Sequence, residues 1–162
     1  HDRSEAKITV IGVPDQVGAA ASIFEVISDA GINIDMIVQN VSRLSDVKTD
    51  ISFTLPMSDG RKGIEALEAN KNKIGFEEVL YDDQIGKVSI VGVGMRSHSG
   101  VTTTFFKALA SEDVNLQMIS TSEIRISVVV STDEVDRAVR SAHAAFGLDD
   151  EEKAVVYAGT GR

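Results

Sequence analysis

Lys7-Ile-Thr-Val-Ile-Gly-Val13 decides the fold, because nearly the same stretch returns as Lys87-Val-Ser-Ile-Val-Gly-Val93 in the second half of the chain. Both runs are rich in β-branched residues and end near a glycine, which is typical of a buried strand followed by a turn. Three more segments recur in the same order: 18–24 matches 100–106, 32–37 matches 114–119, and 50–53 matches 125–128. This indicates a duplicated module, with a period too long for a solenoid repeat.

Each copy is predicted to fold as β-α-β-β-α-β from its hydrophobic periodicity. In the first copy we expect strands at 8–13, 33–41, 50–55 and 77–81, with helices at 18–30 and 58–74. In the second we expect strands at 88–93, 115–121 and 125–130, with helices at 101–111 and 132–146. This order is the ferredoxin-like arrangement. The predicted fold is therefore α+β, with two tandem ferredoxin-like units at residues 1–83 and 84–162.

The sixth element of the second copy is irregular. Residues 149–153 form a charged spacer, and 154–158 form one short apolar strand before a polar end. Either this strand closes the second sheet, or a strand preceding His1 in a longer chain does so. A start at His1 instead of Met is typical of a fragment or a processed piece, so both alternatives stay open.

The composition disfavours several classes of function. Hydrophobic residues make up 43% of the chain and charged residues 25%, as in ordinary globular proteins. Lys and Arg number 16 against 25 Asp and Glu, and the net charge of −9 disfavours nucleic acid and anionic membranes as partners. The absence of cysteine excludes disulfides and cysteine-based metal sites. The sequence shows neither a transmembrane run nor a signal peptide, and we expect a cytoplasmic protein.

No catalytic or metal-binding motif stands out. Gly92-Val-Gly94 follows a strand, but Ser97 stands where a dinucleotide-binding loop needs its third glycine. The histidines at 1, 98 and 143 are not spaced as metal ligands. No serine, histidine and carboxylate can be combined into a catalytic set without arbitrary choices. We expect no catalytic residue, no metal and no cofactor in this chain.

The two strand-to-helix loops are more specific. Pro14-Asp-Gln-Val-Gly18 and Met95-Arg-Ser-His-Ser-Gly100 each end in a glycine, and small residues follow at the start of a helix. Unshielded amides at a helix N-terminus bind carboxylates or phosphates. A glycine can also simply permit a tight turn, but its presence in both copies favours a ligand role. Polar residues at 39–42 and 120–123 either add selectivity for an amino acid or form solvated strand ends.

These residues resemble a known family. Gly12-Val-Pro-Asp-Gln-Val-Gly18 resembles the opening of an ACT domain, a βαββαβ module that binds amino acids. Residues 39–42, 80–89, 94–102 and 119–127 together resemble the C-terminal regulatory half of aspartokinase. The last eight residues resemble the tail of its heterotetrameric form, in which a catalytic α chain and a regulatory β chain arise from one gene. The resemblance covers essentially the whole chain, and the kinase domain is absent from it.

The resemblance implies a regulatory subunit of aspartokinase in amino-acid biosynthesis. Such a subunit senses threonine and lysine, which together inhibit the phosphorylation of aspartate. The expected partners are a second copy, forming a homodimer, and the catalytic α subunit, forming an α2β2 assembly. In the dimer, the first ACT unit of one chain pairs with the second unit of the other. The family's first strand also belongs partly to the second ACT unit, which bears on the irregular sixth element.

The resemblance also implies effector-binding residues. One lobe of the threonine site is expected from Asp15, Gly18, Ala19, Ala20 and Gln39, and the other from Asn115 and Leu116 of the partner chain. By internal symmetry, the twin pocket is expected from Met95, Ser97, Val101, Thr102 and Thr121 with Asn33 and Ile34. The positions associated with effector response are Ser42, Ser52 and Ser122. Ser99 replaces a proline that is common in the family, which makes the second loop less rigid.

Two other functions fit the same fold, since a fold does not settle function. The chain could be a stand-alone amino-acid-binding protein that regulates another partner. It could also be an acylphosphatase-like enzyme, which needs an arginine in its phosphate-binding loop. Arg96 is the only candidate for that arginine, and the first copy has no counterpart.

Overall fold

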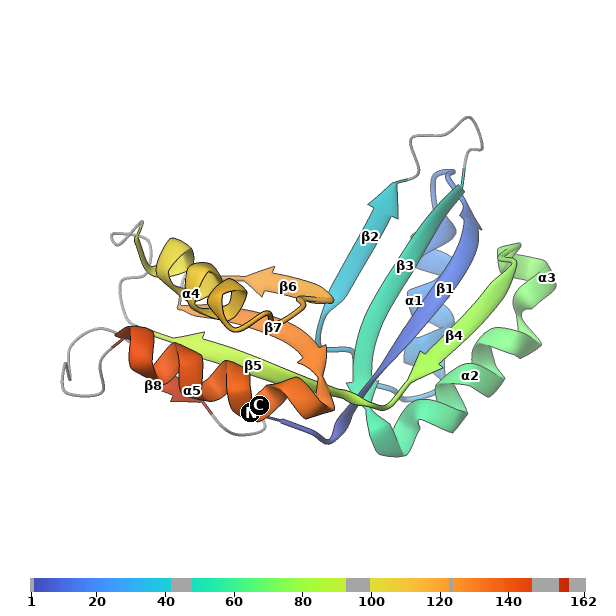
Figure 1. Ribbon diagram of the computed structural model, residues 1–162. Coiled ribbons are helices and arrows are strands. Elements are labelled where there is room, and N and C mark those ends of the chain that lie inside the picture. Colours follow the sequence, from blue (N-terminus) through green and yellow to red (C-terminus); the bar gives the residue numbers. More distant parts are fainter. Residues whose placement is uncertain (1, 42–47, 93–99, 123, 147–154, 158–162) are drawn as a thin grey trace. The chain divides into compact units, whose positions relative to one another are not determined.

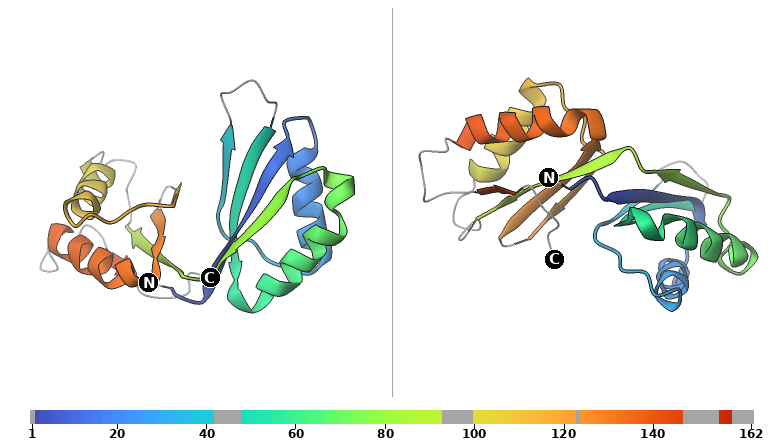
Figure 2. Two further views of the ribbon diagram at one scale, coloured as in Figure 1. Left: turned by 45° about the vertical axis from the view of Figure 1, so that its right-hand side comes forward. Right: turned by 90° about the horizontal axis from the view of Figure 1, so that it is seen from below.

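The computed structural model describes residues 2–41, 48–92, 100–122, 124–146 and 155–157 (Figure 1). The chain divides into two compact units, one of Ser4–Asp83 and one that joins His1–Arg3 to Gln84–Arg162. Each unit is a four-stranded antiparallel sheet with its helices on one face (Figure 2). The predicted α+β fold of two ferredoxin-like units is confirmed.

The first unit follows the predicted order of elements. Its strands are β1 (Glu5–Pro14), β2 (Ile37–Val41), β3 (Lys48–Pro56) and β4 (Glu78–Asp82). Its helices are α1 (Ala19–Asp29), η1 (Met57–Asp59), α2 (Gly60–Ala69) and α3 (Lys71–Ile74). The strand order in the sheet is β2-β3-β1-β4. β1 and β3 therefore lie in the centre, while β2 and β4 form the edges.

The core of the first unit lies between the sheet and the helices. Because side chains alternate along a strand, β1 buries Ile8 and Val10 completely and leaves Thr9 half-buried on the other face. Helix α1 contributes Ile23, which is also fully buried. Phe53 of β3 is fully buried and packs with α1, where its ring meets the ring of Phe24 edge to face at 5.9 Å between centroids.

The second unit repeats the arrangement. Its strands are β5 (Ile85–Val91), β6 (Met118–Thr121), β7 (Arg125–Ser131) and β8 (Val155–Tyr157). Its helices are α4 (Gly100–Ser111), η3 (Thr132–Glu134) and α5 (Val135–Phe146). The strand order is β6-β7-β5-β8, which matches the first sheet strand for strand. Its core is built from fully buried side chains such as Val88, Ile90, Phe105, Leu109 and Val128.

The outer edge of the second sheet is formed by both ends of the described chain. β8 pairs with β5 between Ser89 and Val91, so the C-terminal segment does add a strand to the sheet. Beside it, Asp2 forms an antiparallel bridge with Lys87, in which each backbone amide donates to the other residue's carbonyl at 2.9–3.0 Å. The Arg3 guanidinium also donates to a carboxylate oxygen of Asp136 in α5 at 2.9 Å.

Strands β2 and β6 begin later than predicted. Before β2 and before β6, the chain makes isolated backbone hydrogen bonds to the adjacent strand, β3 or β7, instead of a continuous ladder. The amide of Asp35 donates to the carbonyl of Thr54 at 3.0 Å, and the amide of Gln117 donates to that of Val129 at 2.8 Å. The apolar pattern extends to the equivalent residues Met36, which precedes β2, and Met118, which begins β6; each is buried, with 3% exposure.

The helix predicted at 58–74 is divided at Asn70. Its backbone, with φ −111° and ψ 13°, leaves the helical region. Its side-chain amide donates to the carbonyl of Ala66 at 2.8 Å. Asparagine side chains compete in this way with backbone hydrogen bonds, which explains the break between α2 and α3.

Candidate functional site

The loop between β1 and α1 leaves the start of the helix open. Gly18 is the N-cap residue of α1, with φ 89°, and makes no side-chain cap hydrogen bond. This left-handed backbone favours glycine. A Cβ at Gly18 would meet nothing within 4 Å, so the requirement for glycine is conformational and not steric. The amide of Ala19 donates to the carbonyl of Gln16 at 3.2 Å, and no side chain of the N-cap residue covers the amides that follow it, which suits a carboxylate ligand.

The strand register places Gln39 at the same end of the first unit as this loop. Near the end of β1, Val13 pairs with Thr49. The Nε2 of Gln39 donates to Oγ1 of Thr49 at 3.4 Å. β1 and β2 both end, and β3 begins, on this side of the sheet (Figure 1). The predicted residues that share this end are Asp15, Gly18, Ala19, Ala20 and Gln39.

Helix α4 of the second unit also begins at a glycine, although Gly100 is the first helical residue and lacks the positive φ of Gly18. Gly100 stands at the position of Gly18, and a Cβ there would again meet nothing within 4 Å. Ser22 Oγ donates to the carbonyl of Gly18 at 3.0 Å, and Thr104 Oγ1 donates to that of Gly100 at 2.7 Å. In both copies, therefore, a side-chain hydroxyl four residues after the glycine donates a hydrogen bond to the glycine's carbonyl, in α1 as in α4.

The predicted residues of the twin pocket are placed in part. Val101 and Thr102 lie in the first turn of α4, and Thr121 is exposed at the end of β6. Met95 and Ser97, like the rest of residues 93–99, lie outside the described residues.

The segments leading into β2 and β6 carry the remaining predicted residues. Asn33 is exposed, and Ile34 packs against the core of the first unit, as Leu116 does in the second. The backbone amide of Asn115 donates to Oε2 of Glu134 at 3.2 Å. The other carboxylate oxygen of Glu134 lies 3.6 Å from a guanidinium nitrogen of Arg137. The short helix η3, which ends at Glu134, thus holds the backbone at Asn115.

Ser52 belongs to a hydroxyl pair that bridges the two central strands. Its Oγ lies 2.9 Å from Oγ1 of Thr9 on β1. The corresponding residues of the second unit, Ser89 and Ser127, make the same contact at 2.7 Å. Among the other response positions, Ser122 donates its amide to the carbonyl of Arg125 at 2.7 Å in the turn after β6. Ser42 lies outside the described residues.

The ionisable groups of the described residues form no group of three or more that could hold a metal ion.

Partial burial, reinforced by the negative charges of Asp83 and Asp82, raises the pKa of the Tyr81 hydroxyl above 10.0. Tyr81 is therefore neutral at physiological pH. Across the described residues, no helix has the length and apolarity needed to span a membrane.

Comparisons with known proteins agree with this geometry. The family model described as ACT domain matches residues 8–70 and 88–146, one stretch in each unit. A solved structure of aspartokinase alpha and beta subunits aligns with a TM-score of 0.84 and 44% identity, covering 91% of this chain and 95% of that chain. The ligand-free regulatory subunit of aspartate kinase from Thermus thermophilus aligns with a TM-score of 0.83 and 40% identity, covering 90% and 94%.

The chain belongs to the aspartokinase family, as a tandem of ACT domains. The aspartokinase of Mycolicibacterium smegmatis is 57% identical over 162 residues, which are 100% of this chain and 38% of that protein. The chain therefore spans well under half of the length of this relative, and it corresponds to the regulatory part. The resemblance to aspartokinase found in the sequence is confirmed.

Sequence interpretation of this aspartokinase region missed Thr9 and Ser89, the partners of Ser52 and Ser127. A signal was available, because the duplicated strands carry a hydroxyl at the same place, in Lys7-Ile-Thr9 and Lys87-Val-Ser89. It also missed Glu134 as the group that binds the amide of Asn115. That contact could not be found from the repeat, since the hydrogen bond depends on the local path of the chain.

Proposed function

We propose that this chain is the regulatory β subunit of an aspartate kinase and binds threonine and lysine as allosteric feedback inhibitors of aspartate phosphorylation. One duplicated feature carries the proposal. Each unit presents a glycine-led helix start, and in the first unit the polar edge strand β2 lies at the same end. The support from relatives is the 40% identity to a regulatory subunit of aspartate kinase.

The proposed pocket matches the groups of a free amino acid. The effector's carboxylate accepts hydrogen bonds from the amides after Gly18. Its ammonium binds Asp15 or strand carbonyls, and the hydroxyl of threonine binds Gln39. Each of these groups needs a partner once water is excluded. Asn115 and Leu116 of a second copy close the pocket, and the twin pocket uses the equivalent residues.

The proposed mechanism is linkage. The effector binds one arrangement of the paired ACT units better than another, and this preference is passed to the kinase chain. The chain itself supplies no catalytic group and works in the cytoplasm with a catalytic α subunit, as α2β2. Co-purification with that α subunit distinguishes this function from a stand-alone amino-acid sensor.

The proposed homodimer rests on two exposed edge strands. Ile37 on β2 and Ile119 on β6 are equivalent positions in the repeat and are 53% and 44% exposed. Edge strands with exposed apolar side chains are prone to pair with another chain. Pairing the first unit of one copy with the second unit of the other covers both edges and creates two symmetric joints.

The chain is expected to be a dimer by multi-angle light scattering at micromolar concentration. Ile37→Lys places a charge on the proposed joint and should raise the dissociation constant at least about tenfold, since central apolar contacts dominate such interfaces. The matched control is Leu80→Lys on β4, the opposite edge of the same sheet, where the side chain is 46% exposed. A wild-type monomer, with and without threonine, contradicts the proposed dimer.

Threonine is expected to stabilise the chain against heat, because a ligand that binds only the folded protein shifts unfolding by mass action. Millimolar threonine should raise the melting midpoint by a few degrees, as about 1–2 kcal/mol does for a chain of this size. Differential scanning fluorimetry with threonine, lysine and both together measures this, with serine as the comparison that lacks one methyl group. Equal midpoints with and without threonine count against the site.

A further inference from the structure

The end of β1 is interrupted by a β-bulge. Val10 pairs with Ile51 and Val13 pairs with Thr49, so two residues of β1 lie opposite the single residue Asp50. One of the two, Gly12, has φ 71°. A bulge bends its strand and redirects the chain beyond it. Beyond this bulge lie Pro14 and the loop 15–18.

Asp50 binds the backbone of this bulge. The amide of Gly12 donates to Oδ1 of Asp50 at 3.1 Å. A bulged residue is displaced from the ladder, and its amide needs another acceptor. The carboxylate of Asp50 supplies it, and hydrogen bonds to charged acceptors are stronger than those between neutral groups.

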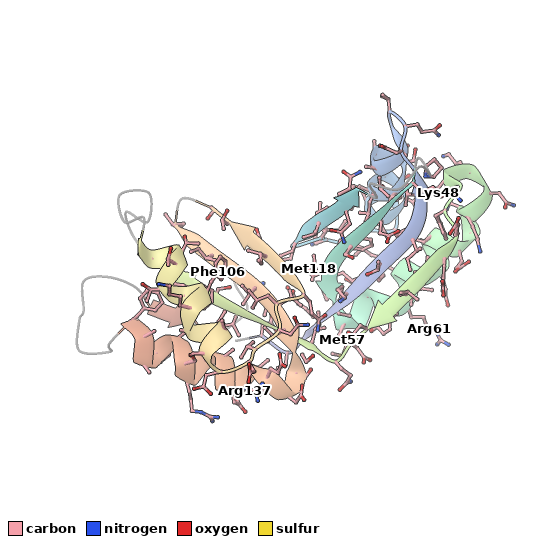
Figure 3. All side chains as sticks on the ribbon, turned by 45° about the horizontal axis from the view of Figure 1, so that its top comes forward. Lys48, Met57, Arg61, Phe106, Met118 and Arg137 are labelled. Carbon is pink, nitrogen blue, oxygen red and sulfur yellow. The ribbon has the colours of Figure 1, made fainter. Side chains whose placement is uncertain are left out.

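Glu77 closes the opposite side of the bulge. Its amide donates to the carbonyl of Ile11 at 2.8 Å. Its side chain occupies the space where a Cβ on Gly12 would lie, with the nearest carbon at 2.6 Å. The carboxylate of Glu77 also pairs with Lys48, the first residue of β3, which is labelled in Figure 3. The bulge is thus held by β3 and by the residue preceding β4.

The two copies of the repeat supply different acceptors for the amide of this glycine. Gly92 corresponds to Gly12, and its amide donates to the backbone carbonyl of Ile124 at 2.9 Å. Arg125 corresponds to Asp50 and has no acceptor atom in its side chain. The amide is therefore bound by main chain in the second unit and by one carboxylate in the first. Of these two glycines, Gly12 is the one whose amide hydrogen bond depends on a side chain, that of Asp50.

We infer that Asp50 is a positioning residue for effector binding: by holding the Gly12 bulge, it sets the path of the loop 15–18 and the direction of the amides after Gly18. Asp50 does not touch the effector in this arrangement. The inference rests on the proposed function for its effector, but its structural half, the ordering of the loop, is independent of any ligand.

The test compares Asp50→Ala with Asp50→Asn in the full 162-residue chain. Asn keeps a side-chain oxygen acceptor, so it should rescue the contact that Ala removes. Asp29→Ala, at the far end of α1, is the control for loss of one negative charge. Hydrogen exchange by mass spectrometry on the peptide 11–20 reports loop order without ligand. Calorimetric titration with L-threonine reports binding.

In Asp50→Ala, amide exchange in 11–20 should accelerate about tenfold, while the equivalent peptide of the second unit stays unchanged. The dissociation constant for threonine should rise about five- to tenfold, the size expected for the loss of one typical intramolecular hydrogen bond. Asp50→Asn and Asp29→Ala should both stay within about twofold of the wild type.

Unchanged exchange in Asp50→Ala overturns the inference. So does accelerated exchange with unchanged threonine affinity, since Asp50 would then serve the fold alone. If the wild-type chain binds neither threonine nor lysine, the proposed function is contradicted, and the effector half of the inference falls with it. The exchange measurement still decides in that case whether Asp50 orders the loop.

Discussion

Replacing Gly86 by alanine is expected to destabilise the second unit by about 1–3 kcal/mol, the usual range for overpacking a core. Gly86 lies in β5, in the centre of the second sheet, and is buried. A Cβ at this position would lie 2.3 Å from Cγ2 of Val135, the first residue of α5, which is fully buried. Helix α5 and strand β5 approach each other closely here because glycine has no side chain at position 86.

A double-mutant cycle identifies the clash. Val135→Ala alone removes two methyl groups and should cost about 1–2 kcal/mol. Combined with Gly86→Ala, it makes room for the new methyl group, so the double variant should lose clearly less stability than the sum of the two single changes. Urea unfolding followed by circular dichroism measures the free energies. If the stability loss of the double variant equals the sum of the two single losses, Val135 is not the residue that the new methyl group clashes with.

The control for this experiment is Gly100→Ala. Gly100 begins α4, and a Cβ there would meet nothing within 4 Å. Alanine is a better helix former than glycine, so the change should be neutral or slightly stabilising. If Gly100→Ala lowers the free energy of unfolding as much as Gly86→Ala does, the effect at both positions comes from the backbone freedom of glycine and not from packing.

The second large effect is expected for Gln39→Ala, which should weaken threonine binding by about 1–3 kcal/mol. The Nε2 of Gln39 donates to Thr49, which leaves its Oε1 to accept a hydrogen bond from the effector's hydroxyl. Without that acceptor, a buried hydroxyl loses its partner. In the complex with the catalytic chain, the same change should relieve threonine inhibition and leave activity without threonine unaltered.

Asn40→Ala is the matched control for Gln39→Ala. Asn40 is the next residue of β2, is also an exposed amide, and points to the opposite face of the sheet. It should change threonine affinity by no more than about twofold. Calorimetric titration measures both variants, and thermal unfolding should show both as stable as the wild type. If Gln39→Ala binds threonine as tightly as the wild type, the proposed role of this side chain is wrong.

The sequence predicts most of the fold because the signals are local. The runs beginning at Lys7 and Lys87 combine β-branched residues with alternation, and both form central strands. Gly31 marks the end of α1 correctly, since its φ of 74° is one that favours glycine. The break at Asn70 was missed because it depends on a competition between one side-chain amide and the helix backbone. Asparagine type alone does not decide that competition.

The candidate site is less predictable than the fold. The glycines at the two helix starts are visible in the repeat, because the conformation of Gly18 restricts the residue type. The role of Asp50 is not visible there, because its counterpart is Arg125 and the symmetry fails at that point. Glu77 and Gly12 are also far apart in sequence, and only the register of β1 with its neighbours brings them together.

The edge of the second sheet has a consequence for the order of folding. Asp2 pairs with Lys87, and Arg3 contacts Asp136 across a sequence separation of 133 residues. The second unit therefore brackets the first along the chain. During synthesis the first unit can fold while its C-terminal neighbour is still incomplete, whereas residues 2 and 3 must wait for their partners. Contacts of such long range slow folding, so we expect the segment around residues 2 and 3 to dock onto the later half of the chain only after the first unit has folded.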